Sequence, residues 1–522
     1  MKKIFYLSLI LLTGIFAACK KDKKTNTNVA TKNGTTLDLI KDSVYLYTKE
    51  DYLWFDQLPS YATFNPRAFT ASTDFLALSK EMDALSQYAI NPNTGKPYEY
   101  VSYSPGQAKY SFVDDGTETS ALNGVKGDFG FDYNYQGVND IRIEYVYPGS
   151  PAANAGLTRG CQITSVNNNS NISYDGSGYG TGSNAHNNLV YNAIFNASTL
   201  TMTVTKLNGT SANVTISTAS YTVNPVLKDT VLDLGSGHKL GYIVFNSFTS
   251  DDNADSKLDA AFTSFSTAGV TDVAVDLRYN GGGYVSTAEY LDNLIVPASG
   301  NNSLMYSTTY NSTLTSGKDV LLKNQVYSDS NGLYTLADVI SQLVANNTVN
   351  FVKKGNLAAN RVFFIVTGGT ASASELTINN LRPKMDVQLV GDTTYGKPVG
   401  FFGLNINKYV MYTPEFATVN SANQGGYFAG MTPGTGGYNG YEVYDDYTKD
   451  FGDPSEVLLS HVINYIQKST YSTSTKVVQN LVESNQPLAL QHSNAKTFRA
   501  TKPHFNGMVF NKRVTANTIH KK

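Results

Sequence analysis

Two short motifs contain the residues of this 522-residue chain that could do chemistry. The first is Thr370-Ala371-Ser372-Ala373-Ser374-Glu375, which directly follows an apolar run ending at Val366 and precedes a helical pattern. A serine at a strand-to-helix junction has its hydroxyl beside the unpaired N–H groups of the first helical turn, where an alkoxide is stabilised. The same position also suits a serine that only caps the helix. The motif alone leaves both interpretations open.

The second motif is rich in glycine and follows another apolar run. It reads Asp276-Leu277-Arg278-Tyr279-Asn280-Gly281-Gly282-Gly283. Consecutive glycines let the backbone approach a ligand closely. Their N–H groups can then point at a developing oxyanion. Glycine runs also form plain turns, so this motif taken alone does not decide between a turn and an oxyanion-binding site.

Both motifs lie in a region, 225–470, where strand and helix patterns alternate. Strands are predicted at 240–245, 273–277, 362–366 and 387–390, and helices at 258–265, from about 285, and after 366. Residues 300–350 form an insertion with a helix near 335–345, and a last amphipathic helix is predicted at 454–467. Repeated strand–helix units predict a largely parallel sheet with its ligand site at the carboxyl ends of the strands. Both motifs stand at such ends.

Two smaller regions precede this one. Residues 37–115 are predicted to be a small helical domain, because apolar residues recur at helical spacing in two segments. These residues are Leu37, Ile40, Val44 and Tyr47, then Phe75, Leu78, Met82 and Leu85, with Ser72 or Thr73 as a cap of the second helix. From 125 to 222 the pattern changes to short strands and turns.

The two ends of the chain differ from its interior. Lys2 and Lys3 precede an apolar run, 4–18, that is too short to span a bilayer and is typical of a signal peptide. Cys19 follows two alanines, which resembles the bacterial lipobox; an ordinary signal peptide with a chance cysteine is the alternative. Polar residues 20–36 are predicted to be a flexible tether. The C-terminal tail, 485–522, shows no clear periodicity and is expected to be loosely packed.

Composition excludes several classes of function. The formal net charge of −2 gives no electrostatic case for nucleic acid as a partner. The second cysteine, Cys161, has no nearby histidine and is predicted to be a core residue. No His or Cys pair has zinc-ligand spacing, so no metal is predicted.

Residues 148–163 resemble a PDZ domain of the bacterial protease type. The segment Pro148-Gly149-Ser150-Pro151-Ala152-Ala153-Asn154-Ala155-Gly156-Leu157 carries the likeness, and Cys161 stands where the family usually has Asp. Such domains bind an extended peptide by strand addition. The resemblance implies a peptide-binding loop near Phe129, Gly130 and Phe131. A domain that only packs against its neighbour is the alternative.

Together, the serine and glycine motifs resemble the C-terminal-processing (tail-specific) protease family. The order "DLR.N.GG", "SASASE" and a later Gly-Lys loop is shared, and the resemblance runs through most of 37–470. It implies that Ser372 is the nucleophile and that Lys397, 25 residues later, is the general base. It also implies an oxyanion hole formed by the N–H of Ala373 with that of Gly282 or Gly283.

The chemistry fits these residue types. A serine hydroxyl needs a base to become nucleophilic, and Ser–Lys pairs are a known variant. The lysine must be neutral, which burial favours. Lowering its pKa from about 10.4 to 7–8 takes roughly 3–5 kcal/mol. Several family members orient the lysine with a glutamine four residues later, where this chain has Phe401. Either another group holds the amine, or the ring helps to desolvate it.

The sequence therefore predicts a multidomain α+β protein: a helical domain, a PDZ-like β domain and a crotonase-like α/β serine protease domain. The predicted function is that of a lipid-anchored envelope endopeptidase that cuts unfolded or C-terminally exposed polypeptides, without a metal or organic cofactor. The alternatives are a peptide-binding lipoprotein that has lost turnover and a carbohydrate-binding or nutrient-uptake lipoprotein.

Overall fold

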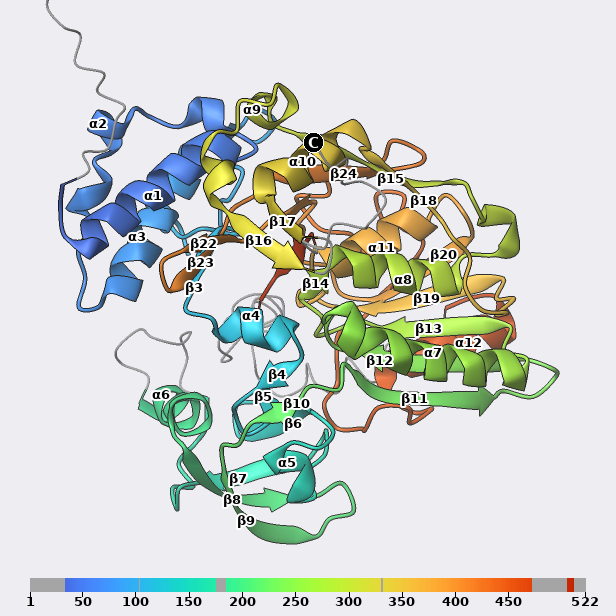
Figure 1. Cartoon of the computed structure of the whole chain (residues 1–522). Coiled ribbons are helices and arrows are strands. Elements are labelled where there is room, and N and C mark those ends of the chain that lie inside the picture. Colours follow the sequence, from blue (N-terminus) through green and yellow to red (C-terminus); the bar gives the residue numbers. More distant parts are fainter. Residues whose placement is uncertain (1–32, 103, 175–184, 330–331, 472–504, 511–522) are drawn as a thin grey trace, which may run out of the picture.

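The computed structural model describes residues 33–102, 104–174, 185–329, 332–471 and 505–510 (Figure 1). The predicted signal peptide, Cys19 and most of the tether lie outside these residues. Within the described part of the chain, no helix has the length and apolar character needed to cross a membrane.

Three helices form the N-terminal region, at the upper left of Figure 1. They are α1 (Thr36–Asp51), α2 (Tyr61–Phe64) and α3 (Asp74–Ser86). The predicted apolar faces of α1 and α3 are buried against each other, with Val44 and Met82 each 1% exposed. Thr73 caps α3 by accepting a hydrogen bond from the N–H of Leu76, so the predicted start of this helix is confirmed.

A five-stranded antiparallel sheet follows, at the bottom of Figure 1. Its strands are β5 (Phe131–Gly137), β6 (Asp140–Val146), β7 (Gln162–Val166), β8 (Thr199–Thr205) and β9 (Ser211–Ser217). Helices α5 (Pro151–Asn154) and α6 (Ala185–Tyr191) and a π-helical turn (Asn192–Asn196) accompany it. Strands β4 (Val125–Lys126) and β10 (Tyr221–Thr222) pair at the two ends of this unit. Cys161 is fully buried in its core, as predicted.

The third region is built on a six-stranded sheet. Its order is β11 (Val226–Asp233), β12 (Lys239–Phe245), β13 (Asp272–Asp276), β19 (Arg361–Val366), β20 (Asp386–Gly391) and β25 (Gly440–Glu442). Only β11 runs antiparallel to its neighbour, so the predicted largely parallel sheet is confirmed.

Helices cover both faces of this sheet because its strands are apolar on both sides. Alternate residues such as Val275 and Phe364 share a core with α7 (Asp251–Ala268), α8 (Val285–Ile295) and α11 (Ala373–Leu381). The intervening residues, such as Ala274 and Phe363, share another core with α12 (Val457–Lys468).

Smaller elements surround the central sheet. A four-stranded sheet joins β18 (Thr348–Asn350), β15 (Leu304–Tyr310), β24 (Phe416–Asn420) and β21 (Val399–Gly400). The insertion contains α9 (Ser312–Thr315), the hairpin β16 (Val326–Asp329) and β17 (Gly332–Thr335), and the predicted helix, α10 (Leu336–Ala345). The remaining elements are β1 (Ile90–Asn91), β2 (Lys96–Pro97), β3 (Phe112–Asp114), α4 (Thr117–Leu122), β22 (Leu404–Ile406) and β23 (Tyr409–Tyr412).

One part of the predicted C-terminal tail is not loosely packed. Strand β26 (Gly507–Val509), drawn in red, pairs in parallel with β14 (Gly282–Tyr284), the end of the glycine motif (Figure 1). Met508 is fully buried. For 505–510 the expectation of a loose tail was wrong, because this short segment buries its apolar side chains against residues far away in the sequence.

Candidate active site

Ser372 stands at the turn between β19 and α11, at the carboxyl edge of the central sheet. Its φ of 56° and ψ of −103° are unusual for a residue with a side chain, and such geometry costs on the order of 1–3 kcal/mol. The side chain is fully buried, and its hydroxyl donates a hydrogen bond to the carbonyl of Val399 at 3.4 Å. The fold therefore holds a strained serine at a strand-to-helix junction, the position that the sequence predicted.

Glu375, in the first turn of α11, connects the serine to the Gly-Lys loop. One carboxylate oxygen accepts hydrogen bonds from the N–H groups of Ser372 (2.9 Å) and Lys397 (2.8 Å). The other accepts from the N–H of Gly396 (2.8 Å) and the hydroxyl of Thr394 (2.5 Å). Burial raises the pKa of Glu375, and these four hydrogen bonds oppose the shift. A single carboxylate thus fixes the backbones of both residues predicted to be catalytic.

Lys397 places its amine in a dry and largely aromatic environment. The side chain is fully buried, and Nζ lies 3.4 Å from the centroid of the Phe401 ring and 5.5 Å from that of Tyr110. Burial lowers the pKa of Lys397 well below its ordinary value, although the carboxylates of Glu99 and Glu375 oppose this shift. The Phe401 ring therefore lies directly beside the amine, which fits the expectation that it helps to desolvate Lys397.

Asn280 of the glycine motif forms hydrogen bonds with the serine motif. The Asn280 carbonyl accepts hydrogen bonds from the N–H of Ala371 (3.0 Å) and the hydroxyl of Ser374 (2.9 Å). Its side chain donates to the carbonyl of Phe245 (2.8 Å) and accepts from the N–H of Gly282 (2.8 Å). Asn280 thereby holds the two motifs side by side at the ends of the adjacent strands β13 and β19.

The predicted oxyanion-hole residues lie together in this arrangement. A Cβ atom placed on Gly282 would lie 3.1 Å from the nitrogen of Ala373, so these two backbones are in close approach. Both Gly282 (φ 107°) and Gly283 (φ 139°) have conformations that favour glycine. Because the Gly282 N–H already donates to Asn280, the N–H of Gly283 suits the second donor position better.

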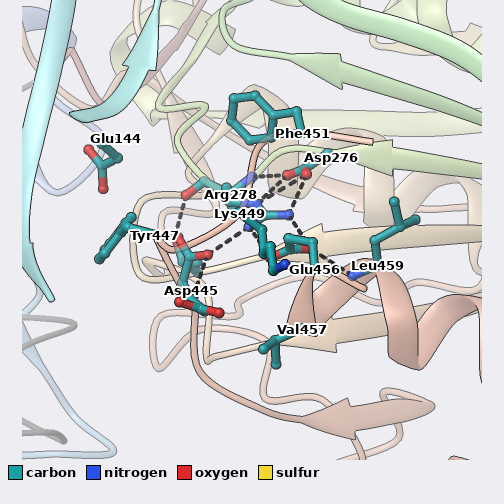
Figure 2. A network of polar contacts seen from close by, with 12 residues as sticks. Glu144, Asp276, Arg278, Asp445, Tyr447, Lys449, Phe451, Glu456, Val457 and Leu459 are labelled. Atoms are coloured by element: carbon teal, nitrogen blue, oxygen red, sulfur yellow. Dashed lines mark hydrogen bonds and ion pairs between the residues drawn. The ribbon is translucent and has the colours of Figure 1, made fainter. Parts of the chain in front are cut away.

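Behind the glycine motif lies a buried cluster of charges that sequence reasoning missed (Figure 2). Arg278, fully buried, pairs with Asp276 (2.7 Å), Glu456 (2.9 Å) and Asp445 (2.6 Å). Asp445 also pairs with Arg159 of the five-stranded unit at 2.9 Å. Arg278 was the sequence feature that could have indicated this cluster, because an arginine just after a buried strand requires carboxylate partners. The pairs with Asp445 and Glu456 span 167 and 178 residues, so no local pattern identifies the partners.

The predicted peptide-binding residues are found at the start of β5. Phe129 and Phe131 are 1% and 7% exposed and belong to the core of the five-stranded unit. The N–H of Gly130 donates to Asp128 at 2.8 Å, and its carbonyl accepts from the N–H of Tyr147 at 2.8 Å. These residues therefore stand apart from the serine and lysine, and the Gly130 backbone is engaged within its own unit.

Comparison with known proteins agrees with this geometry. Residues 239–433, which contain the serine and glycine motifs and the Gly-Lys loop, match the model of peptidase family S41. No curated protein matches the chain.

One of the solved structures compared shares the fold, with a TM-score above 0.5. A putative S41 protease from Bacteroides fragilis superimposes with a TM-score of 0.56 at 23% identity, over 82% of this chain and 97% of that one. The photosystem II D1 C-terminal processing protease gives 0.40 at 17% identity, over 77% and 93%. Mature CPAF in complex with lactacystin gives 0.41 at 10% identity, over 86% and 100%. The match to the S41 family model over residues 239–433 supports a serine-type peptidase.

Proposed function

We propose that this chain is an endopeptidase that uses a Ser372–Lys397 dyad to hydrolyse peptide bonds in unfolded or C-terminally exposed polypeptides. The observation that carries the proposal is the Glu375 carboxylate, which binds the backbones of Ser372 and Lys397 through one oxygen. A structural role for either residue gives no reason to fix both to one buried group. The second requirement, a base whose neutral form is favoured, is supported by the burial of the Lys397 amine, which lowers its pKa well below the ordinary value.

The proposed reaction has two stages, acylation and deacylation of Ser372. The neutral Lys397 amine takes the proton of the Ser372 hydroxyl, and Oγ attacks the carbonyl carbon of the substrate. The N–H groups of Ala373 and Gly283 stabilise the oxyanion that forms. The Lys397 ammonium then protonates the leaving amine, which breaks the C–N bond and leaves an acyl ester on Ser372. Water, activated by the same amine, hydrolyses the ester and restores the serine.

We also propose roles for the five-stranded unit and for Cys19. The five-stranded unit acts as a PDZ-like domain that binds or gates the substrate, although Phe129, Gly130 and Phe131 are themselves engaged within the unit. Lipidation of Cys19 anchors the chain to a membrane of the cell envelope, facing the periplasm or the exterior. These roles rest on the sequence resemblance and on the antiparallel sheet with its short helix after Ser150.

The test is proteolysis of unfolded casein by the chain starting at residue 20. The unsubstituted chain is compared with Ser372→Ala and Lys397→Ala, and Lys384→Ala serves as a lysine control outside the site. Cleavage that the first two substitutions abolish and the control retains supports the dyad. Cleavage that survives both would reject it. If a fluorophosphonate fails to label Ser372 and no form cleaves casein, the alternative of a peptide-binding lipoprotein without turnover is favoured.

A further inference from the structure

The groove beside Ser372 already contains a peptide strand, and it belongs to the same chain. Residues 505–510 lie between β14 and the segment at Phe401. On one side, the N–H of Gly507 donates to the carbonyl of Gly281 at 2.9 Å, within a parallel ladder that pairs Gly282 with Gly507. On the other side, the N–H of Phe401 donates to Met508 at 2.8 Å, and its carbonyl accepts from Phe510 at 3.1 Å. This is the strand addition by which proteins bind extended peptides.

The backbone of this strand covers the groups proposed to act on a substrate. The amine of Lys397 donates its hydrogen bond to the carbonyl of Asn506. A Cβ atom on Gly282 would lie 2.2 Å from the carbonyl oxygen of Gly507 and 3.1 Å from the nitrogen of Ala373. The tail thus engages the base and places a carbonyl beside the oxyanion donors. A second polypeptide cannot take this position while the tail occupies it.

The side chains of the segment fill two aromatic sites, one toward each end. The Phe505 ring lies 5.8 Å from the centroids of Phe112 and Tyr412. The Phe510 ring lies 4.4 Å from Phe416 and is stacked at 5.7 Å on Phe402. Aromatic pairs at such separations contribute about 0.5–1.5 kcal/mol each beyond the area they bury. The contacts indicate subsites suited to large apolar side chains.

Between these two aromatic sites, the tail has room only for a glycine, at position 507. A Cβ atom on Gly507 would lie 2.4 Å from the Phe505 ring and 2.8 Å from the Phe401 ring. On the facing strand, a Cβ on Gly281 would lie 2.0 Å from the carbonyl oxygen of Phe505. The two backbones can approach this closely only because both positions lack side chains.

We propose that residues 505–510 are an intramolecular pseudosubstrate, which occupies the substrate groove and keeps the peptidase inactive toward other polypeptides until it is displaced. The proposal rests on the proposed function of the site and deepens it. The groove binds an extended segment in parallel to β14, with aromatic side chains flanking a glycine. The tail inhibits because Lys397 is bonded to its carbonyl and is not free to activate Ser372.

Tethering makes such inhibition effective with few contacts. A segment joined to its own site has an effective concentration on the order of millimolar. A strand whose separate affinity is about 0.1 mM would then leave the groove free in roughly one molecule in ten or fewer. Opening the tail is therefore expected to raise cleavage at least about tenfold.

The experiment uses the chain from residue 20 with a single change, Gly507→Val, which the two rings cannot accommodate. Gly127→Val is the matched control, because a Cβ there would meet nothing within 4 Å. The probe is a fluorescent peptide with the sequence of residues 504–511, and a second peptide carries valine at the position of Gly507. Polarisation measures binding, casein cleavage measures activity, and intact mass reports any cut in the tail.

The Gly507→Val chain is expected to bind the probe at least tenfold more tightly than the unsubstituted and Gly127→Val chains, and to ignore the valine peptide. Its casein cleavage should be at least tenfold faster and inhibited by the probe alone. Equal binding to all chains, or to none, would overturn the proposal. So would rapid cleavage of the unsubstituted tail at Gly507, which would make it a substrate. A third outcome separates the two proposals. If only the Gly507→Val chain binds the probe and no chain cleaves casein, the proposed peptidase function is rejected while the assignment of the groove stands.

Discussion

Replacing Glu375 by glutamine tests whether one carboxylate positions the whole dyad. Glu375 accepts four hydrogen bonds, two on each oxygen, and a glutamine side chain offers one oxygen and one NH₂ group. If the NH₂ group faces Thr394, that hydroxyl can rotate to accept, but the N–H of Gly396 is left facing a donor. The opposite orientation leaves the N–H groups of both Ser372 and Lys397 without an acceptor. At least one buried backbone N–H is therefore orphaned.

The expected loss of stability follows from these contacts. An orphaned buried donor costs about 1–3 kcal/mol, and each of the two retained bonds loses about 1 kcal/mol when its acceptor becomes neutral. Removing a buried charge offsets part of this, since burial raises the pKa of Glu375. We expect the free energy of unfolding to fall by about 2–4 kcal/mol.

The assay combines urea unfolding with casein kinetics. Because displacement of reacting groups by about 1 Å can cost 10²-fold, kcat should fall by 10–100-fold with little change in KM. Glu442→Gln, at an exposed position on β25, is the control and should change stability by less than about 0.5 kcal/mol. A Glu375→Gln chain that matches the control in stability and in kcat would refute the positioning role.

Three further changes test neighbouring parts of the site. Burial lowers the pKa of Lys397 in the folded chain, so between that lowered pKa and 10.5 the unfolded chain binds more protons and stability should rise with pH. In Lys397→Met, urea unfolding at several pH values should show that this rise is lost and that stability at neutral pH is greater. Arg278→Met leaves buried carboxylates without their counter-charge, so the free energy of unfolding in urea should fall by about 3–5 kcal/mol. Arg142→Met is the control, and it should lower that free energy by about 1 kcal/mol because its ion pair is partly exposed. Gly283→Ala would place its Cβ 2.0 Å from the carbonyl oxygen of Phe248 and should abolish casein cleavage. Gly237→Ala, also at a positive φ (82°) but with nothing within 4 Å of its Cβ, should keep it. Equal effects in either pair of variants, or an unchanged pH dependence, would contradict the corresponding step.

The sequence predicted those parts of the fold whose structure depends on short-range patterns of residues. The helical spacing of Leu37 to Tyr47 gave α1, and the strand–helix alternation gave the parallel sheet. Ser372 could be placed at a strand-to-helix junction for the same reason, since an apolar run followed by a capped helical pattern leaves few alternatives. Its left-handed φ could not be predicted, because the surrounding hydrogen bonds impose it.

The elements that sequence reasoning missed depend on contacts between distant segments. Strand β26 forms because Met508 and its neighbours find an apolar groove beside β14, more than 220 residues earlier in the chain. The run Met508-Val509-Phe510 within a polar tail was the one available signal of burial. The role of Glu375 in binding the Gly-Lys loop was likewise hidden, since no short-range pattern connects Glu375 with Gly396 and Lys397.

The charge cluster around Asp445 has a consequence for domain motion. Asp445 lies between Arg278 of the central sheet and Arg159 of the five-stranded unit, and both guanidinium groups are almost fully buried. A rigid-body rotation of that unit away from the sheet would separate Arg159 from Asp445, which would keep only its pair with Arg278. The buried pair of Arg159 and Asp445 therefore helps to hold the five-stranded unit against the central sheet, and substitution of Asp445 would weaken that contact.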